Sequence, residues 1–340
     1  MRIAITGAGW YGCSIALGLK QRGHEVTLYE HAPHIFAGAS GANPARLHQG
    51  QHYPRSRVTR AFCQEHQSAF LARYGHLTRH VPINIYAVAA DDSLVDFGTY
   101  CQVLRGEIEF ITVHDPRELG LRNVEGAILT GERHILIREA RDFFERELAN
   151  NIRLESGLRS IQNFKLGVKK TAFDWHIDCT FCAQDAENID RYEPCVTVLL
   201  EGPTDKAVTI MDGPFPSLYP WDEEQNMNSL TSAKLTPLSK QCKSYEEAKA
   251  VLDTATRDEI TARATAMIDQ ASTYWPPVRD LYNFVDYRLG IRAMPKSAAD
   301  ARLVDIIRTG ERSLRVRAGK IDAVIHAERQ ICQMLAPYGV

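Results

Sequence analysis

Three glycines near the start of the chain, Gly7, Gly9 and Gly12, form the pattern G-x-G-x-x-G directly after the apolar run Ile3 to Ile5. An apolar run without polar alternation is typical of a strand buried on both faces of a parallel sheet. In such a turn, the first glycine permits a tight bend, the second allows a pyrophosphate to come close, and the third lets the next helix pack on the strand. The pattern therefore predicts a dinucleotide-binding βαβ unit.

The residues after the glycines complete this unit. Apolar side chains between Ser14 and Arg22 predict a helix that Gly23 ends, and Val26 to Tyr29 predict a second strand. Glu30 follows that strand at the position where a carboxylate accepts hydrogen bonds from an adenosine ribose. Because a carboxylate repels a 2′-phosphate, NADP is disfavoured.

The composition is that of an ordinary soluble protein. The 340 residues are 44% hydrophobic and 24% charged, with a formal net charge of -2, which allows a large core and two domains. The sequence has no basic excess that would indicate nucleic acid, no apolar run of membrane-spanning length, and no room for a signal peptide before the first strand. We therefore expect a cytoplasmic protein that binds neither nucleic acid nor membrane.

The eight cysteines are scattered along the chain. Cys179 and Cys182 have the spacing of a metal-binding pair, but the sequence offers no second pair to complete a zinc site. We expect free thiols in a reducing compartment and no metal.

The chain departs from a simple NAD-binding domain after Glu30. Residues 31–44 form a long stretch rich in glycine and proline, which predicts a loop that lies along a ligand. Residues 45–54 are dense in hydrogen-bonding side chains, and Val58 to Tyr74 predict a helix.

The sequence resembles the D-amino-acid-oxidase-like superfamily of FAD-dependent oxidoreductases. The resemblance rests on residues 7–30, on the loop Gly38-Ala-Ser-Gly41, and on two later stretches, 290–295 and 318–328. It implies an α/β fold with a Rossmann-like FAD-binding domain, three-layered around a mainly parallel sheet, and a second α+β substrate domain built on an antiparallel sheet. We expect the first domain to comprise residues 1–75, 130–182 and 290–340, and the second 76–129 and 183–289.

The resemblance also implies the cofactor and its contacts. We expect non-covalent FAD in contact with Gly7, Gly9, Gly12, Glu30, Ser40, Arg46, Gly319, Lys320 and Ile321. The last three residues would lie near the flavin pyrimidine, where N–H dipoles or a cation stabilise the reduced anion. Arg46 and His48 would lie near the flavin ring or beside it.

The substrate site follows from the same resemblance. Arg292 matches the arginine that binds the substrate carboxylate in D-amino-acid and glycine oxidases, although Ala293 stands where the family has proline. The planar guanidinium suits a carboxylate because it donates two charge-assisted hydrogen bonds at once. His48 and Tyr287 are the candidate catalytic side chains beside Arg292, and Tyr53 and Tyr219 are further candidates for positioning.

The remaining pattern predicts the substrate domain. An antiparallel meander is expected over residues 196–200, 207–211, 218–221 and 229–232. A helix interrupted near 253–257 is expected over 246–274, followed by a strand over 281–288 and a final helix over 318–328. A strand is also expected within 173–182.

Because no second G-x-G-x-x-G appears, we expect no separate NAD(P)H site, and electrons should enter from an organic substrate. The resemblance implies hydride transfer from the α-carbon of an amine, amino acid or 2-hydroxy acid to flavin N5, with O2 or another acceptor reoxidising the flavin. The alternatives are an NAD-dependent dehydrogenase, a flavin monooxygenase or redox-neutral flavoenzyme of a biosynthetic pathway, and a non-catalytic flavin-binding protein.

Overall fold

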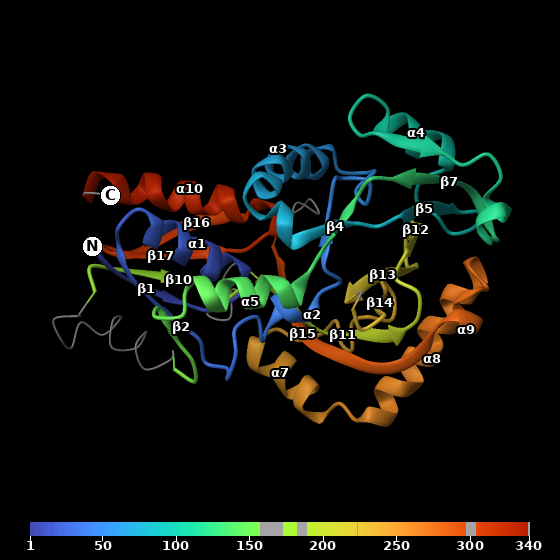
Figure 1. The fold of residues 1–340 in the computed structure, drawn as a ribbon. Helices are drawn as coiled ribbons and strands as arrows, with labels where there is room; N and C mark the ends of the chain where they lie inside the picture. Colours follow the sequence, from blue (N-terminus) through green and yellow to red (C-terminus); the bar gives the residue numbers. More distant parts are fainter. Residues whose placement is uncertain (157–172, 182–188, 223, 297–303, 339–340) are drawn as a thin grey trace.

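The computed structural model of the chain describes residues 1–156, 173–181, 189–222, 224–296 and 304–338. The molecule is elongated, with a mainly parallel sheet and both termini at one end and a larger, mainly antiparallel sheet at the other (Figure 1). The predicted fold class is therefore confirmed. The residue boundaries of the two domains stay a prediction.

The described residues form a six-stranded sheet in the order β16-β17-β10-β1-β2-β9. Its strands are β1 (Arg2–Thr6), β2 (Glu25–Tyr29), β9 (Ile152–Arg153), β10 (Trp175–Asp178), β16 (Asp305–Gly310) and β17 (Ser313–Arg317). β1 lies between β2 and β10 and runs parallel to both, and Ile3 and Ile5 on it are fully buried. A strand enclosed on both faces needs an apolar sequence throughout, which explains why its residues do not alternate.

Helices pack around this sheet. They are α1 (Trp10–Gln21), α3 (Arg57–Tyr74), α5 (Ile137–Glu147) and α10 (Val324–Leu335). Trp10, Phe70 and Phe144, from three of these helices, meet in one buried aromatic cluster with ring centroids 5.3 to 5.6 Å apart. The cluster fixes α1, and with it the glycine-rich turn, against α3 and α5.

The second sheet has the order β15-β11-β14-β13-β12-β5-β7-β6 among the described residues. Its strands are β5 (Ile83–Ala89), β6 (Phe110–Thr112), β7 (Val124–Thr130), β11 (Ile189–Glu201), β12 (Lys206–Met211), β13 (Pro216–Asp222), β14 (Met227–Ser232) and β15 (Asn283–Pro295). The predicted antiparallel pairing is right for β12 with β13 and for β13 with β14, but wrong for β11 with β12. β11 pairs with β14 instead of β12, and β12 instead pairs in parallel with β5.

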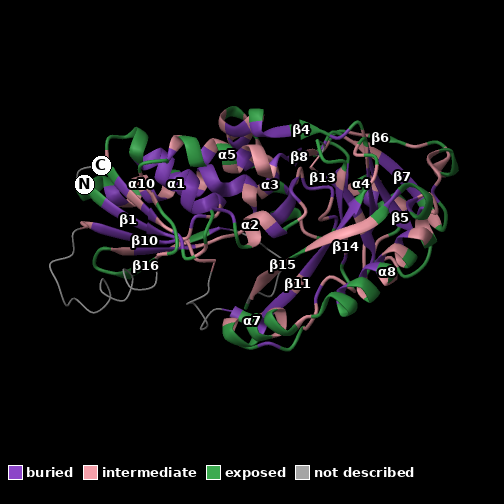
Figure 2. Cartoon of the chain, turned by 60° about the horizontal axis from the view of Figure 1, so that its bottom comes forward, coloured by how far each residue is buried: buried purple, intermediate pink, exposed green. Residues whose placement is uncertain are grey.

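The two faces of the second sheet differ in character. Val198, Val208 and Ile85 point to one face and form an apolar core with α8 (Arg257–Tyr274). The alternate residues, such as Tyr86 and Tyr219, point to the other face. Figure 2 shows that the inner strands are largely buried, whereas the edge strand β15 is only partly buried and α7 (Tyr245–Thr254) and α8 expose their outer sides. The face that carries Tyr86 and Tyr219 is thus the face available for a site.

A third, small sheet joins the two larger ones. It consists of β3 (Arg46–Leu47), β4 (Thr78–His80) and β8 (Arg133–Ile135), with β8 in the middle. Arg46 pairs with His134 and Leu47 pairs with Arg133. Continuing this antiparallel register by one residue brings His48 opposite Glu132.

The remaining described elements are short or lie at the edges. They are the helices α2 (Ala39–Ala42), α4 (Phe97–Leu104) and α9 (Val278–Leu281), and the 3-10 turns η1 (Gly75–Leu77), η2 (Pro116–Leu119), η4 (Ile321–Ala323) and η5 (Ala336–Tyr338). No helix in the described ranges is both long and apolar enough to cross a membrane.

Several predicted boundaries are wrong. The first helix begins at Trp10, earlier than predicted, and the final helix begins only at Val324, after the turn η4. Residues 290–295 lie inside β15 rather than in a separate segment. The strand predicted within 173–182 is β10, and Cys182 lies outside the described residues. The predicted interruption of the long helix is confirmed, because Thr256 caps α8 with a reciprocal hydrogen-bonded box to Glu259.

Candidate active site

The glycine-rich turn joins β1 to α1 by close backbone contacts. Gly7 has φ +94°, in the left-handed region that glycine favours. A Cβ on Gly12 would lie 1.9 Å from the Gly7 carbonyl oxygen, and a Cβ on Gly9 would lie 2.9 Å from Ser40 Oγ. Each of the three positions therefore needs the space that glycine leaves.

Two side chains accept hydrogen bonds from backbone N–H groups around the glycine-rich turn. The Glu30 carboxylate is buried and accepts hydrogen bonds from Ala8 N at 2.8 Å and Ala32 N at 3.0 Å. Ser40 Oγ accepts from Trp10 N at 3.0 Å. The helix N-terminus is electropositive, and its N–H groups and Glu30 lie at one edge of the parallel sheet. The predicted contacts at Gly7, Gly9, Gly12, Glu30 and Ser40 are thus brought together by the fold.

The segment before α10 returns to this region. The Tyr11 hydroxyl on α1 donates to the Lys320 carbonyl oxygen, which ties residues 319–321 to the glycine-rich helix. Ile321 begins η4 and packs against the apolar core of the first sheet. Residues far apart in the chain therefore line the same edge of the domain, as the resemblance implies.

Lys320 carries a buried cation at this edge. Its Nζ lies 3.6 Å from the centre of the Tyr53 ring and has no acceptor at hydrogen-bonding geometry among the described residues. Burial lowers the pKa of Lys320, but Tyr53, Cys63 and Asp322 together raise that pKa by more. Lys320 is therefore charged at neutral pH.

Asp322 lies two residues further along and is also buried. Neither carboxylate oxygen has a donor at hydrogen-bonding geometry in the described ranges. Burial raises the pKa of Asp322 to about 6, and the charge of Lys320 opposes this rise. Burial likewise raises the pKa of the nearby Cys63 thiol to about 12, which keeps Cys63 protonated and unreactive.

A second polar cluster forms around Glu132, which follows β7. Its carboxylate accepts hydrogen bonds from His48 Nδ1 at 3.0 Å, Gln49 N at 3.2 Å, Tyr86 Oη at 2.5 Å and Tyr219 Oη at 3.4 Å. The carboxylate is an acceptor only, so His48 carries its ring proton on Nδ1 and leaves Nε2 as an acceptor. The result is a neutral imidazole oriented by a carboxylate, the arrangement of a general base.

The charge states of this pair follow from its surroundings. Burial, and after it the charge of Lys320, lower the pKa of His48, Glu132 partly offsets both, and the resulting pKa is about 4. Burial raises the pKa of Glu132, but His48, Arg46 and Tyr86 together lower that pKa by more. At neutral pH, His48 is therefore neutral and Glu132 is ionised.

Arg46 lies beside this cluster. Its guanidinium stacks over the Tyr219 ring at 4.3 Å, and its Nη2 donates to Ser217 Oγ. The Tyr219 hydroxyl also accepts from Asn84 Nδ2 at 3.1 Å, which fixes the ring under the guanidinium. Arg46, His48 and Tyr219 are thus brought together, and Tyr53 lies 5.5 Å from His48 between ring centroids.

The other predicted catalytic residues lie apart from this cluster. Arg292 is on β15 at the edge of the second sheet and donates through Nε to Glu193 Oε2 at 3.0 Å, and through Nη2 to the same oxygen. Tyr287 is also on β15, but it pairs with Val198 and packs on the apolar face against the core under α8. Tyr287 thus faces away from Tyr86 and Tyr219, because the register puts it on the other side of the sheet.

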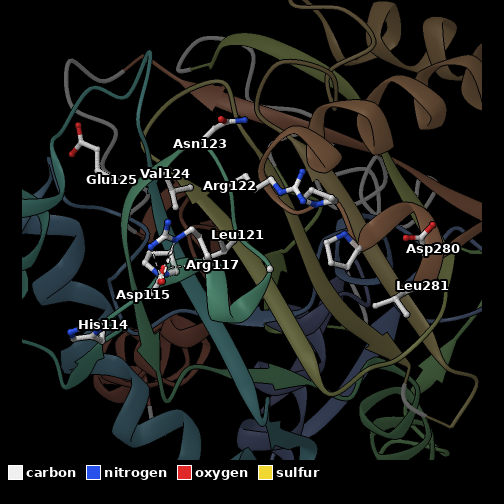
Figure 3. A pocket seen from close by; sticks show the side chains of 14 residues that line it. His114, Asp115, Arg117, Leu121, Arg122, Asn123, Val124, Glu125, Asp280 and Leu281 are labelled. Carbon is white, nitrogen blue, oxygen red and sulfur yellow. Dashed lines mark hydrogen bonds and ion pairs between the residues drawn. The ribbon is translucent and has the colours of Figure 1, made fainter.

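A wide groove of about 1100 Å³ lies at the far end of the second sheet (Figure 3). It is lined by residues 114–117, 120–125, 276–277 and 280–281, and Arg117 there pairs with Asp115. The groove adjoins the start of β7, whereas Glu132 follows its end, roughly 20 Å along the strand. The groove is thus separate from the cluster around His48.

Sequence reasoning missed Glu132, Tyr86 and Asp322. Glu132 stands between two strands in the ordinary turn sequence Gly-Glu-Arg, and nothing local marks it as buried. Only the pairing of β3 with β8 shows that Glu132 lies beside His48, and a single sequence does not reveal that pairing. Among the described residues, no group of three or more His, Cys, Asp or Glu side chains is arranged to hold a metal ion.

Comparison with known sequences identifies the family of the chain. The sequence model of the family described as FAD dependent oxidoreductase (DAO) matches residues 2–163. The chain is 34% identical over 337 residues to the FAD-dependent monooxygenase FPY4 of Fusarium mangiferae, covering 98% of this chain and 90% of that protein. The chain belongs to the D-amino-acid-oxidase-like family of FAD-dependent oxidoreductases. A further relative, the FAD-dependent monooxygenase kojA of Aspergillus flavus, is 27% identical over 98% of this chain and 86% of its own length.

Solved structures of this family share the fold. Glycine oxidase from Geobacillus kaustophilus superposes with a TM-score of 0.71 at 14% identity, over 99% of this chain and 95% of that one. The L-alpha-glycerophosphate oxidase from Mycoplasma pneumoniae, solved with FAD bound, gives 0.70 at 13% identity, over 98% and 94%. At such identities the likeness concerns the fold alone.

The family assignment settles two predictions. The chain is an FAD-dependent enzyme, which removes the NAD-dependent and non-catalytic alternatives. The residues present fit FAD: the glycine turn leaves no side chain in the way, the N-terminus of α1 suits a pyrophosphate, and the buried cation of Lys320 suits a reduced flavin. That the cofactor is held without a covalent bond stays a prediction.

Proposed function

We propose that this enzyme oxidises a small organic substrate at a carbon that bears an amine or hydroxyl group. The observation that carries the proposal is the buried imidazole of His48, held by the Glu132 carboxylate at 3.0 Å, while the nearby charge of Lys320 helps to lower the pKa of His48. When bound, FAD supplies a two-electron acceptor for the hydride that leaves the substrate carbon. The substrate is an amine, an amino acid or a 2-hydroxy acid.

Three side chains, His48, Glu132 and Lys320, have distinct roles in this reaction. His48 Nε2 takes the proton from the substrate hydroxyl or ammonium group, while the carbon gives up its hydride, so that a ketone or an imine forms. Glu132 stabilises the imidazolium produced and keeps its orientation. Lys320 stays charged beside the reaction site and offsets the negative charge that reduction brings. O2 would then take the two electrons and two protons, one that left the substrate with the hydride and one from the imidazolium of His48, and leave as hydrogen peroxide.

A second candidate is a monooxygenase, which the names of two relatives favour. In that reaction one oxygen atom of O2 enters the product, and an external reductant supplies the electrons. The buried polar cluster suits either candidate, because a general base activates a hydroxyl in both.

Anaerobic mixing separates the two candidates. A panel of amines, amino acids and 2-hydroxy acids is added to the purified holoenzyme without O2, and flavin absorbance is followed. We expect at least one member of the panel to bleach the flavin without an added reductant. If none does, while NADH or NADPH bleaches the flavin and labelled oxygen from O2 enters the product, the enzyme is a monooxygenase.

The pH dependence of flavin reduction provides a further prediction. A base must be unprotonated, and the pKa of His48 is lowered to about 4, so its neutral form persists on acidification. We expect protonation of His48 to leave the rate constant for flavin reduction unchanged from about pH 8 to about pH 6, and to lower it only near pH 4. Stopped-flow measurement of flavin reduction at each pH across this range gives the rate constant.

Lys320→Met tests the cause of that shift. Because the lysine charge lowers the pKa of His48, its removal should move the acid limb upward, toward the ordinary histidine value of about 6.5. An acid limb near that value in the unaltered enzyme, unmoved by the substitution, would argue against a buried neutral base.

A further inference from the structure

Arg46 is a buried cation that contacts no carboxylate among the described residues. In the described ranges three arginines are buried: Arg46, Arg60 and Arg315. Arg60 Nε donates to Glu107 at 2.8 Å, and Arg315 Nε donates to Asp178 at 2.9 Å. A buried charge without an opposite charge in contact is costly unless a ligand supplies one. Arg46 thus differs from Arg60 and Arg315, because no carboxylate among the described residues accepts a hydrogen bond from it.

The contacts of Arg46 are neutral groups. Its Nη2 donates to Ser217 Oγ, its face covers the Tyr219 ring, and its buried Nε has no acceptor within the described part of the chain. Ser217 Oγ lies 2.8 Å from Thr209 Oγ1, so it is shared with another hydroxyl. These contacts hold the guanidinium plane in place. The ionised Glu132 attracts the Arg46 charge from nearby but makes no hydrogen bond or ion pair with it.

Glu132 does not serve as the missing partner. Its two oxygens accept from one imidazole, one backbone N–H and two tyrosine hydroxyls, and the guanidinium of Arg46 is not among these donors. Glu132 therefore orients His48, and Arg46 remains available for a further oxyanion.

Arg292, the residue that resemblance assigns to the substrate carboxylate, is differently placed. Glu193 accepts both of its hydrogen bonds and also accepts Arg191 Nε at 2.9 Å. To bind a substrate, Arg292 would first have to give up this internal carboxylate. Arg46 needs no such exchange.

We propose that Arg46 binds a carboxylate of the substrate and so fixes the substrate beside His48. Arg46 and His48 stand two residues apart in the extended segment around β3, which directs both side chains to one side. A 2-hydroxy or 2-amino acid has the matching chemistry, because its carboxylate adjoins the carbon that bears the proton-donating group. This inference rests on the proposed function and adds the residue that selects the substrate class.

The test measures binding, without turnover. The holoenzyme is titrated with benzoate and, in parallel, with neutral benzamide of the same shape, and the change in flavin absorbance gives each Kd. We expect benzoate to bind and Arg46→Gln to weaken it about 10- to 100-fold, the loss expected for a charge-assisted hydrogen-bonded pair. Arg46→Lys, which keeps the charge but not the planar fork, should lose less.

Arg292→Gln is the matched control, and we expect it to change benzoate affinity less than about threefold. Benzamide should bind weakly and be indifferent to Arg46→Gln. The proposal is overturned if benzoate does not bind the unaltered enzyme, if Arg46→Gln binds it equally well, or if Arg292→Gln loses it instead. Loss of FAD from Arg46→Lys would also overturn it, because Arg46 would then hold the cofactor.

These outcomes separate the two proposals. If benzoate binding depends on Arg46 but no member of the panel reduces the flavin, the anion site stands and the proposed reaction fails. If the panel reduces the flavin and Arg46→Gln leaves benzoate binding unchanged, the reaction stands and the assignment of Arg46 fails.

Discussion

Replacing His48 by glutamine is expected to lower kcat/KM about 100- to 10,000-fold for whichever panel substrate reduces the flavin, with FAD still bound. Glutamine retains a hydrogen-bonding side chain but takes up no proton at neutral pH. The proton of the substrate hydroxyl or ammonium group would then have no base within reach. The measurement is the rate of anaerobic flavin reduction, together with the ratio of flavin to protein absorbance.

Two further variants make this result specific. Glu132→Gln should lower the same rate by a smaller factor, because the imidazole remains but loses the acceptor that fixes its tautomer. His80→Gln changes an exposed histidine on β4 and should leave the rate unchanged. If His48→Gln reduces the flavin as fast as the unaltered enzyme, His48 is not the base.

Replacing Gly7 by alanine is expected to abolish FAD binding and to lower the free energy of unfolding by roughly 2–5 kcal/mol. Two effects add at this position. A residue with a Cβ is strained at φ +94°, which costs about 1–2 kcal/mol. The Cβ would also lie 2.6 Å from the Cys179 carbonyl oxygen, and such overpacking costs about 1–3 kcal/mol more.

Gly23 provides the matched control. It has φ +84°, but no atom lies within 4 Å of the position of its Cβ. Gly23→Ala should therefore show the strain alone, about 1–2 kcal/mol, and keep its yellow colour. Thermal unfolding and flavin absorbance of both variants provide the comparison. Equal losses of unfolding free energy in the two variants would show that the close contact of Gly7 with the Cys179 carbonyl does not contribute to the destabilisation.

Local elements were predictable where short-range chemistry decides them. The buried strand, the glycine turn and the acidic residue after β2 all lie within the first thirty residues, and their spacing reflects contacts made along the chain. The break between α7 and α8 was predictable for the same reason, since Thr256 caps a helix with a residue three positions away. The start of α10 was not, because the turn η4 that precedes it depends on packing against distant residues.

The candidate site was only partly predictable. His48 and Arg46 were selected by resemblance, but the partners that decide their charge and orientation are far away in the chain. Glu132 lies 84 positions from His48, and Ser217 lies 171 positions from Arg46. The pairing of Arg292 with Glu193, 99 positions away, is equally invisible to local pattern.

The sequence by itself determined the dinucleotide-binding unit, because glycine spacing and strand periodicity are properties of neighbouring residues, and its resemblance to a family indicated the FAD-dependent family and the candidate site residues. Only the tertiary structure decided which of those side chains meet. The pairing of β3 with β8 joins His48 to Glu132, and the face of the second sheet separates Tyr219 from Tyr287. Burial then sets the charges, since the same histidine in water would have a pKa near 6.5 rather than about 4.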